Sequence, residues 1–273
     1  YPYGGFNQVI QAMIKVCKKF GIQFLLNEKV KKINIIKNKA TSLITNKNNK
    51  IISDIIVASA DYAHVEKDLI TTKFRNYTTK YWEKKTFAPS SLIFYLGINL
   101  KLNNLIHHNL FFDENVEEFT KEIYESKLWP KKPLFYVCCP SKTDTKIAPN
   151  GKENIFILMP IPIGVKDKKQ IREKYFNLII KRLEKYCNQK IKEHIEYKSS
   201  YCINDFISDY NAYKGNAYGL ANTLSQTANL KPKIINKKVK NLFYTGQLTV
   251  PGPGVPPALI SGQLVANYII KNS

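Results

Sequence analysis

Residues 241–257 are the stretch that decides the fold: Asn241-Leu-Phe-Tyr-Thr-Gly246-Gln-Leu-Thr249-Val-Pro251-Gly252-Pro-Gly254-Val255-Pro256-Pro257. A short apolar strand ends at a glycine, a Pro/Gly loop follows, and an amphipathic helix over 258–270 opens on two prolines. Glycine lets the backbone approach a ligand closely, and a helix N-terminus favours anionic groups. The stretch predicts a cofactor loop; from these residues alone, a turn-rich connection before a terminal helix is an equally good interpretation.

Length and composition indicate a globular protein. The 273 residues are 44% hydrophobic, which is enough for one large domain or two smaller ones. The sequence has no apolar run long enough to span a membrane, and its first residues do not read as a signal peptide. The dinucleotide fingerprint G-x-G-x-x-G does not occur in it.

The net charge of +21 suggests nucleic acid as a partner, but the choice of basic residues argues against it. Only Arg75, Arg172 and Arg182 are arginine among 42 basic residues, whereas base reading and bidentate phosphate contacts favour arginine. The lysines are scattered among Asn and Ile, which is typical of a solvated surface. We therefore expect no nucleic-acid partner.

Cysteine usage predicts a reducing compartment, the cytoplasm. The chain has five cysteines, an odd number, and no C-x-x-C pair. This pattern argues against both a disulfide framework and a zinc site.

Hydrophobic periodicity predicts the main elements. Apolar residues recur at helical spacing from Phe6 to Phe20, and Gly21 stands where a helix-terminating residue is expected. Alternating and continuous apolar runs predict strands, and a charged amphipathic run predicts a second helix. The predicted strands are 22–26, 30–36, 40–45, 51–58 and 91–100, and the helix is 171–187.

Four further blocks accompany the 241–257 stretch in a fixed order along the chain: residues 1–6 (Tyr-Pro-Tyr-Gly-Gly-Phe), 105–112 (Leu-Ile-His-His-Asn-Leu-Phe-Phe), 139–144 (Cys-Pro-Ser-Lys-Thr-Asp) and 210–220 (Tyr-Asn-Ala-Tyr-Lys-Gly-Asn-Ala-Tyr-Gly-Leu). Together these blocks resemble the C-terminal part of bacterial-type phytoene desaturases, flavoenzymes of carotenoid biosynthesis in the amine-oxidase-like superfamily. The resemblance runs from residue 1 to the end of the chain.

The resemblance implies an α/β fold: an FAD-binding, Rossmann-like lobe whose N-terminal βαβ unit is missing, and an α+β substrate-binding lobe. On this reading the chain is the C-terminal part of a longer enzyme. The change of pattern along the chain assigns residues 1–74 and 236–273 to the FAD-binding lobe and residues 75–235 to the substrate-binding lobe.

The function that the resemblance implies is FAD-dependent desaturation of phytoene towards lycopene, with this portion alone inactive. Alternatives are another carotenoid desaturase, isomerase or saturase of the superfamily, or a non-catalytic remnant. The implied partners are the hydrocarbon phytoene and a membrane surface, to which exposed lysines would hold the enzyme peripherally.

The resemblance also assigns cofactor-binding residues: Gly246, Thr249, Gly252, Gly254, Val255 and Pro256 in the loop, and Val30, whose backbone would face the adenine. Many related flavoenzymes have Gly-Asp at the start of this loop, whereas this chain has Gly246-Gln247, so a carboxylate contact to the cofactor is not expected here. Tyr213 and Tyr218 are the aromatic residues expected near the flavin.

Other candidate sites are weaker. Adjacent side chains of an extended segment point to opposite faces, so His107 and His108 are not expected to share a metal, and no metal site is predicted. Asp205 and Asp209 would pair if helical, but a turn is favoured for an Asn/Asp/Ser-rich segment. No hydrolytic triad is suggested, and no catalytic residue is predicted.

Overall fold

The computed structural model describes residues 1–272, and its first element is the helix predicted from apolar spacing, α1 (Asn7–Lys19). The helix ends as expected, because Gly21 adopts a φ of 73° and its N–H donates to the carbonyl of Lys18. The next N–H, of Ile22, donates to Cys17. The prediction of this helix is confirmed.

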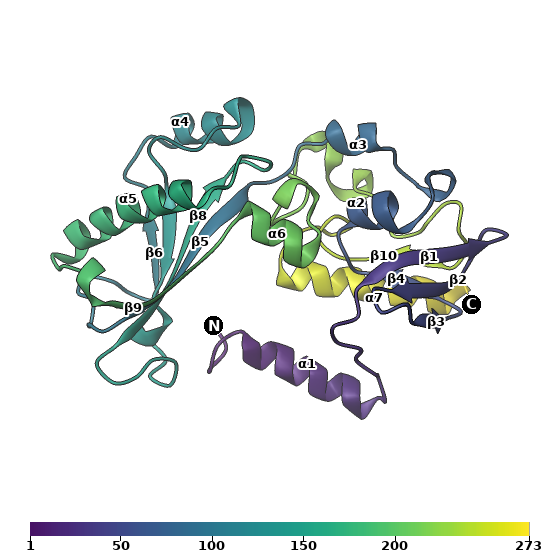
Figure 1. Ribbon diagram of the computed structural model, residues 1–273, viewed down its shortest axis with the longest axis horizontal. Helices are drawn as coiled ribbons and strands as arrows, with labels where there is room; N and C mark the ends of the chain where they lie inside the picture. The colour runs from purple at the N-terminus through teal and green to yellow at the C-terminus, as the bar shows by residue number, and fades with distance from the viewer. Residues whose placement is uncertain (273) are drawn as a thin grey trace. The chain divides into compact units, whose positions relative to one another are not determined.

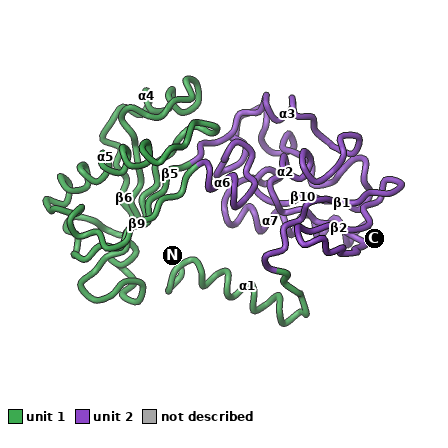
Figure 2. The backbone as a smooth tube through the Cα atoms, viewed as in Figure 1, with its two compact units in different colours: residues 1–25, 91–202 green, residues 26–90, 203–273 purple. Residues whose placement is uncertain are grey.

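Two compact units make up the chain (Figure 2). Unit 1 is Tyr1–Leu25 with Ser91–Cys202, and unit 2 is Leu26–Ser90 with Ile203–Ser273. The change from one unit to the other falls after residues 25, 90 and 202, whereas the predicted lobes change after residues 74 and 235. Unit 2 is discontinuous in sequence, because unit 1 contributes an insertion between its two halves.

Unit 2 contains two small sheets (Figure 1). One is an antiparallel meander in the order β1-β2-β3, and the other pairs β4 with β10 in parallel. The strands are β1 (Val30–Ile36), β2 (Lys39–Thr45), β3 (Lys50–Ile52), β4 (Ile56–Ala58) and β10 (Leu242–Tyr244).

Two strand predictions for this part of the chain need correction. The run 51–58 is divided between β3 and β4, which belong to different sheets. The run 22–26 is no strand: Leu26 is 77% exposed, and this segment has no paired neighbour among residues 1–272. A continuous apolar run shows that a segment is suited to burial, but only a partner strand makes it part of a sheet.

The helices of unit 2 are short except for the last: α2 (Tyr62–His64), α3 (Thr79–Glu83), α6 (Ile203–Tyr210) and α7 (Val255–Asn272). Stacked aromatic rings form its core, with the rings of Tyr62 and Tyr244 3.8 Å apart. Asn241 fixes the meander to the parallel pair, because its side-chain amide bonds both the N–H and the C=O of Ala40 and the C=O of Asp54.

Unit 1 is built on a five-stranded sheet in the order β6-β7-β8-β5-β9. Helix α5 packs on it through residues spaced three and four apart, and its Phe176 ring meets Phe94 of β5 at 5.3 Å. The strand predicted over 91–100 and the helix predicted over 171–187 are confirmed. The elements are β5 (Ser90–Ile98), β6 (His108–Phe111), β7 (Phe135–Cys138), β8 (Glu153–Ile161), β9 (Ile195–Tyr201), α4 (Val116–Lys121) and α5 (Lys169–Cys187).

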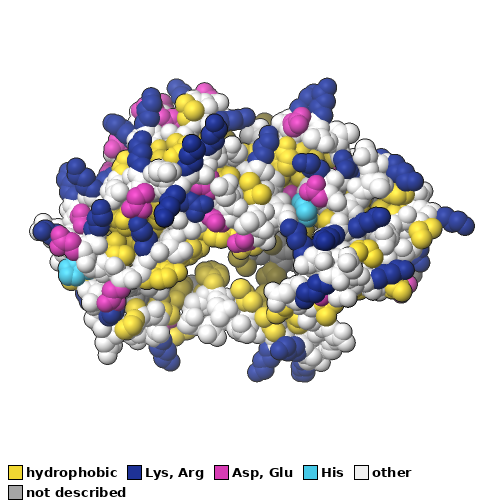
Figure 3. Space-filling view, in the orientation of Figure 1, with side chains coloured by type: hydrophobic (Ala, Val, Ile, Leu, Met, Phe, Trp, Pro, Cys, Tyr) yellow, Lys and Arg dark blue, Asp and Glu magenta, His cyan; other side chains and the backbone are white. Residues whose placement is uncertain are grey.

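Basic side chains are dispersed over the surface. Lys and Arg are spread across elements of both units on the face shown in Figure 3, with acidic groups between them, and they form no single continuous patch on that face. None of the helices in residues 1–272 combines the length and the apolar character that crossing a bilayer would require.

Candidate cofactor site

A crevice opens in unit 2 where the parallel strands β4 and β10 end. Ser59 follows β4 and Thr245 follows β10, and both line a cavity of about 510 Å³. Ligands of open α/β sheets bind outside the carboxyl ends of parallel strands, so this is the position expected for a bound cofactor. The lining residues are Ser59, Ala60, Asp61, Tyr62, Phe206, Asp209, Tyr210, Asn211, Ala212, Asn216, Ala217, Thr245, Gly246, Gln247 and Leu248.

The beginning of the predicted cofactor loop is held in a fixed conformation by hydrogen bonds. The N–H and the hydroxyl of the buried Thr249 both donate to the carbonyl of Gly246, at 3.0 and 2.9 Å. The N–H of Gly246 donates to the hydroxyl of Ser261 on α7, at 2.8 Å. Thr249 therefore fixes the conformation of the loop. Its N–H and hydroxyl are both bonded to Gly246, so neither is available to bind a cofactor directly.

Glycine is required at two later positions of the loop. Gly252 has a φ of 134° and Gly254 a φ of 112°, a region that residues with a Cβ rarely adopt. A Cβ at position 252 would also lie 3.1 Å from Cε of Lys231. The two glycines give the loop a shape that no other residue reproduces without strain.

The first turn of α7 offers fewer donors than the sequence suggested. The helix begins at Val255, directly before the two prolines on which it was predicted to open; Pro256 and Pro257 have no N–H, and the N–H of Ala258 donates to Gly254 at 2.9 Å. Val255 alone is left to present a backbone N–H to a ligand from this turn. The prolines that start the helix therefore also remove two of its backbone donors.

Asn216 connects three segments around the crevice. Its Nδ2 donates to Asp61 at 3.1 Å, and its Oδ1 accepts hydrogen bonds from the N–H of Gly219 and from Nε2 of Gln247. Gln247 is thus bonded to the protein itself. Asn216 is 1% exposed, and sequence reasoning did not single it out within the 210–220 block.

Asp61 anchors the wall of the crevice. Its carboxylate accepts from the N–H groups of His64 and Tyr213 and from Asn216. Burial raises the pKa of Asp61 above its ordinary value, and these hydrogen bonds oppose the rise. Since both oxygens are engaged, the carboxylate acts as a positioning group for the 213–216 segment.

Lys231 is the second residue that sequence reasoning missed. The side chain is 2% exposed, and its Nζ has no hydrogen-bond partner among the described residues. Burial lowers the pKa of this ammonium group. A buried cation without a partner is unfavourable unless a ligand supplies one, and Lys231 lies directly against Gly252 of the loop. In the sequence, Lys231 differs from other lysines only in that it precedes a proline within a charged run.

Three other residues predicted near the cofactor do not line the crevice: Val30, Tyr213 and Tyr218. Val30 opens β1, pairs with Thr45, and is not among the residues that line the crevice. Tyr213 packs its ring 5.3 Å from that of Phe87, while Tyr218 is 39% exposed. The structure brings neither tyrosine into the lining, although Ala217 between them belongs to it.

The acidic pair lies on a helix rather than in the favoured turn. Asp205 and Asp209 are both in α6, which is eight residues long, so the turn interpretation was wrong. Asp209 lines the crevice and accepts a hydrogen bond from Ser208.

The histidine pair lies in unit 1, whereas the residues that line the crevice belong to unit 2. The rings of His107 and His108 are 4.2 Å apart, and Cys138 lies beside them. The argument that their side chains must diverge was wrong, because His107 precedes β6 and is not part of the extended strand. Burial and the neighbouring His108 lower the pKa of His107.

Comparison with known proteins places this geometry in a family. Residues 1–270 match the family described as flavin containing amine oxidoreductase. A carotenoid 3,4-desaturase of Haloarcula japonica is 34% identical over 273 residues, which are 100% of this chain and 55% of the relative. A zeta-carotene-forming phytoene desaturase of Myxococcus xanthus is 27% identical over 277 residues, 99% of this chain and 52% of the relative. The chain thus spans about half the length of the curated relatives it matches.

The fold agrees with the sequence comparison. A solved structure of an oxidoreductase from Methanosarcina mazei superposes with a TM-score of 0.63 at 15% identity, covering 97% of this chain and 55% of that one. The mixed α/β architecture is therefore that of known oxidoreductases, and the resemblance to phytoene desaturases noted from the sequence is confirmed. With a family match over residues 1–270, the chain belongs to the flavin containing amine oxidoreductases, a membership that implies a flavin cofactor.

Proposed function

We propose that the protein is an FAD-dependent carotenoid desaturase that acts on phytoene in the direction of lycopene. The observation that carries the proposal is the crevice at the ends of β4 and β10, which is lined by residues 246–248 at the start of a Pro/Gly loop whose later glycines, Gly252 and Gly254, have positive φ. Two carotenoid desaturases match essentially the whole chain, which supports a polyene hydrocarbon as the substrate class.

The residues of this chain fit a flavin cofactor. The buried ammonium of Lys231, without a partner among the described residues, calls for an anionic or electron-rich partner, and the missing Cβ of Gly252 makes room for this side chain against the loop. Gly254 and Val255 would hold the cofactor through backbone groups, with the start of the loop shaped by the hydrogen bonds of Gly246 to Thr249 and Ser261.

A hydrocarbon substrate has no carbonyl or phosphoryl group to attack, so the reaction depends on redox chemistry. When bound, oxidised FAD would supply the two-electron acceptor that dehydrogenation of a CH2–CH2 unit requires. The protein's own residues position the ligand and exclude water. Asp61, Asn216 and Gln247 hold the crevice wall through direct hydrogen bonds, so their part is orientation.

A second candidate reaction is desaturation at the 3,4 position of a carotenoid that is already partly desaturated. The relative from Haloarcula japonica, with 34% identity, is described as a carotenoid 3,4-desaturase. The two candidates share the cofactor and the chemistry, and they differ in the carotenoid that the enzyme accepts.

Docking to a membrane surface is part of the proposal, because carotenoid hydrocarbons reside in the bilayer. The net charge of +21 and the dispersed lysines favour a peripheral, cytoplasmic association with anionic lipid.

Product analysis distinguishes the candidates. The longest reading frame that contains this sequence is expressed in one host that accumulates phytoene and in another that accumulates lycopene, and carotenoids are separated by chromatography. Products with more conjugated double bonds in the phytoene host are expected, and conversion only in the lycopene host would favour 3,4-desaturation. No new carotenoid in either host, from a soluble flavin-loaded protein, would contradict both.

A further inference from the structure

Three side chains of unit 1 that can bind a metal gather at the start of β6 and the end of β7. Each of His107, His108 and Cys138 offers one ligand atom, and these atoms lie within 4.8 Å of one another. The group has no part in the crevice described above, whose lining belongs entirely to unit 2.

The sheet register brings the group together. His108 pairs directly with Cys138 in the antiparallel ladder of β6 and β7, so the two side chains stand on the same face. His107, just before β6, accepts the N–H of Cys139 through its carbonyl at 2.8 Å. This bond places the His107 ring beside His108 and within reach of Cys138.

In both histidines Nδ1 is engaged by a side-chain hydroxyl, which leaves Nε2 as the nitrogen that could bind a metal. Nδ1 of His107 is 2.5 Å from the hydroxyl of Thr143, and Nδ1 of His108 is 2.6 Å from that of Tyr136. Metal-ligating histidines are commonly held in this way, with one nitrogen bonded to the protein and the other to the metal. Nε2 of His107 is buried and has no partner among the described residues, which is unfavourable unless a ligand occupies that position.

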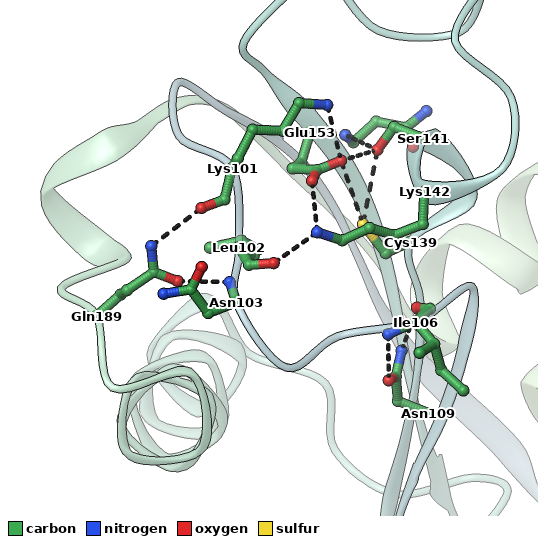
Figure 4. A network of polar contacts seen from close by, with 11 residues as sticks. Lys101, Leu102, Asn103, Ile106, Asn109, Cys139, Ser141, Lys142, Glu153 and Gln189 are labelled. Atoms are coloured by element: carbon green, nitrogen blue, oxygen red, sulfur yellow. Dashed lines mark hydrogen bonds and ion pairs between the residues drawn. The ribbon is translucent and has the colours of Figure 1, made fainter.

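The segments that carry these side chains are fixed by polar contacts (Figure 4). The side chain of Asn109 bonds the N–H and the carbonyl of Ile106, which closes the turn before β6. It also donates to the carbonyl of Val137 on the neighbouring strand β7. On the other side, Lys142 donates to the carbonyl of Leu102 and pairs with Glu153, which anchors the turn leading to Thr143. Ligands held by rigid elements need little rearrangement to bind a metal.

We propose that His107, His108 and Cys138 form a zinc site. Two imidazole nitrogens and a thiolate are a donor set that Zn²⁺ prefers over Mg²⁺ or Ca²⁺, which take oxygen ligands. Zinc bonds of about 2.0 to 2.3 Å need ligand atoms somewhat closer than in the free cluster, and His108, the exposed member of the group, is the side chain with most room to adjust. A water molecule would complete a tetrahedral site. The proposal is independent of the carotenoid reaction, because it concerns the other unit.

Metal titration of the chelator-treated chain tests the proposal. Zn²⁺ is added in competition with a chromophoric chelator, and Co²⁺ is used in parallel because its thiolate complexes absorb in the near ultraviolet and, when tetrahedral, strongly in the visible. One equivalent of Zn²⁺ per chain and a thiolate-to-cobalt band are expected. Absence of that band from the folded wild-type chain would overturn the proposal without reference to any variant.

Variants assign the ligands. Cys138→Ser should abolish the thiolate band, and His107→Gln or His108→Gln should weaken Zn²⁺ binding by at least about tenfold. Thr143→Ala removes only the partner of Nδ1 and should weaken binding by about 10-fold to 100-fold. Cys17→Ser and His194→Gln, outside the group, should leave the spectrum and the affinity unchanged. A band that persists in folded Cys138→Ser, as judged by circular dichroism, would assign the metal elsewhere and contradict the proposal.

Discussion

The ammonium of Lys142 lies 2.8 Å from Oε1 of Glu153, a β8 carboxylate whose side chain has no exposed surface. Ser141 donates a hydrogen bond to the other oxygen of Glu153, and Lys101 lies 3.6 Å from it. Burial alone would raise the pKa of Glu153, but the hydrogen bonds from Lys142 and Ser141 lower it below its ordinary value. The carboxylate is therefore kept ionised inside unit 1 by its neighbours.

Removing the Lys142 charge should destabilise the chain. Lys142→Met is expected to lower the free energy of unfolding by about 3 kcal/mol, because a buried charge that loses its partner is left uncompensated. Since the pKa of Glu153 is lowered in the folded state, the stabilisation is present above the unfolded pKa of about 4.3 and is lost as the pH falls through the folded pKa. Urea titrations should show the difference from wild type at pH 7 and its decrease below about pH 4. The exposed Lys146→Met is the control, and equal stability of the two variants at pH 7 would contradict this account.

Substitution of the loop glycines should prevent flavin retention. Gly252→Val and Gly254→Val, made in the longest reading frame that contains this sequence, force a side chain into positions with φ of 134° and 112°. The flavin absorbance of the purified protein should fall to background. Gly262→Ala on α7, where a Cβ meets nothing within 4 Å, should leave the protein yellow. Normal flavin content in either valine variant would refute the assignment of this loop.

Lys231 should affect stability and cofactor binding in opposite directions. Lys231→Met removes a buried cation without a partner, so the flavin-free chain should gain about 1–3 kcal/mol. The same change should weaken FAD binding by about tenfold or more, measured by titration on the longest reading frame. Lys233→Met, an exposed neighbour, should change neither quantity. A variant with unchanged FAD affinity would exclude Lys231 from the cofactor site.

This 273-residue chain by itself should bind FAD weakly or not at all. A glycine-rich turn at a helix N-terminus supplies the main pyrophosphate contacts in dinucleotide-binding folds, and this sequence contains no G-x-G-x-x-G. The first turn of α7 does not replace it, because its two prolines have no N–H. Titration of the chain with FAD, followed by flavin fluorescence, tests this expectation, and micromolar or tighter affinity would contradict it.

Membrane association should depend on ionic strength. Lysines near an anionic surface contribute about 1 kcal/mol each, and the Debye length falls from about 8 Å at 0.15 M to about 3 Å at 1 M salt. Flotation should recover the protein with anionic liposomes at low salt and lose much of it at high salt, while neutral liposomes serve as the control. Failure to float with any composition at low salt would refute the docking model.

Local signals predicted much of the fold. Residue spacing was sufficient for α1, α5 and β5, and the apolar strand, glycine loop and prolines at 241–257 predicted β10 and the start of α7. In each of these segments the pattern that specifies the element lies within the element itself. The run 51–58 was misjudged because its division depends on partners far away in sequence, β2 for one part and β10 for the other.

The sites depend more on contacts that are distant in sequence. The loop glycines were recognisable, but Lys231 and Asn216 become notable only when the fold shows one without a partner and the other connecting three segments. In the same way, nothing in the sequence near His108 indicates Cys138, because their proximity follows from the pairing of β6 with β7. Sequence reasoning therefore proposed the loop and did not single out the two neighbouring residues Lys231 and Asn216.

The insertion of unit 1 into unit 2 begins and ends on neighbouring strands, since Ile93 of β5 pairs with Tyr201 of β9. The two ends of this inserted segment lie side by side. Its length or content can therefore change without separating the two halves of unit 2, because closing a short connection there carries little entropic penalty. The unit that carries the crevice and the unit that carries the histidine–cysteine group can thus diverge at different rates. One cofactor-binding frame can in this way accept different inserted units over evolutionary time.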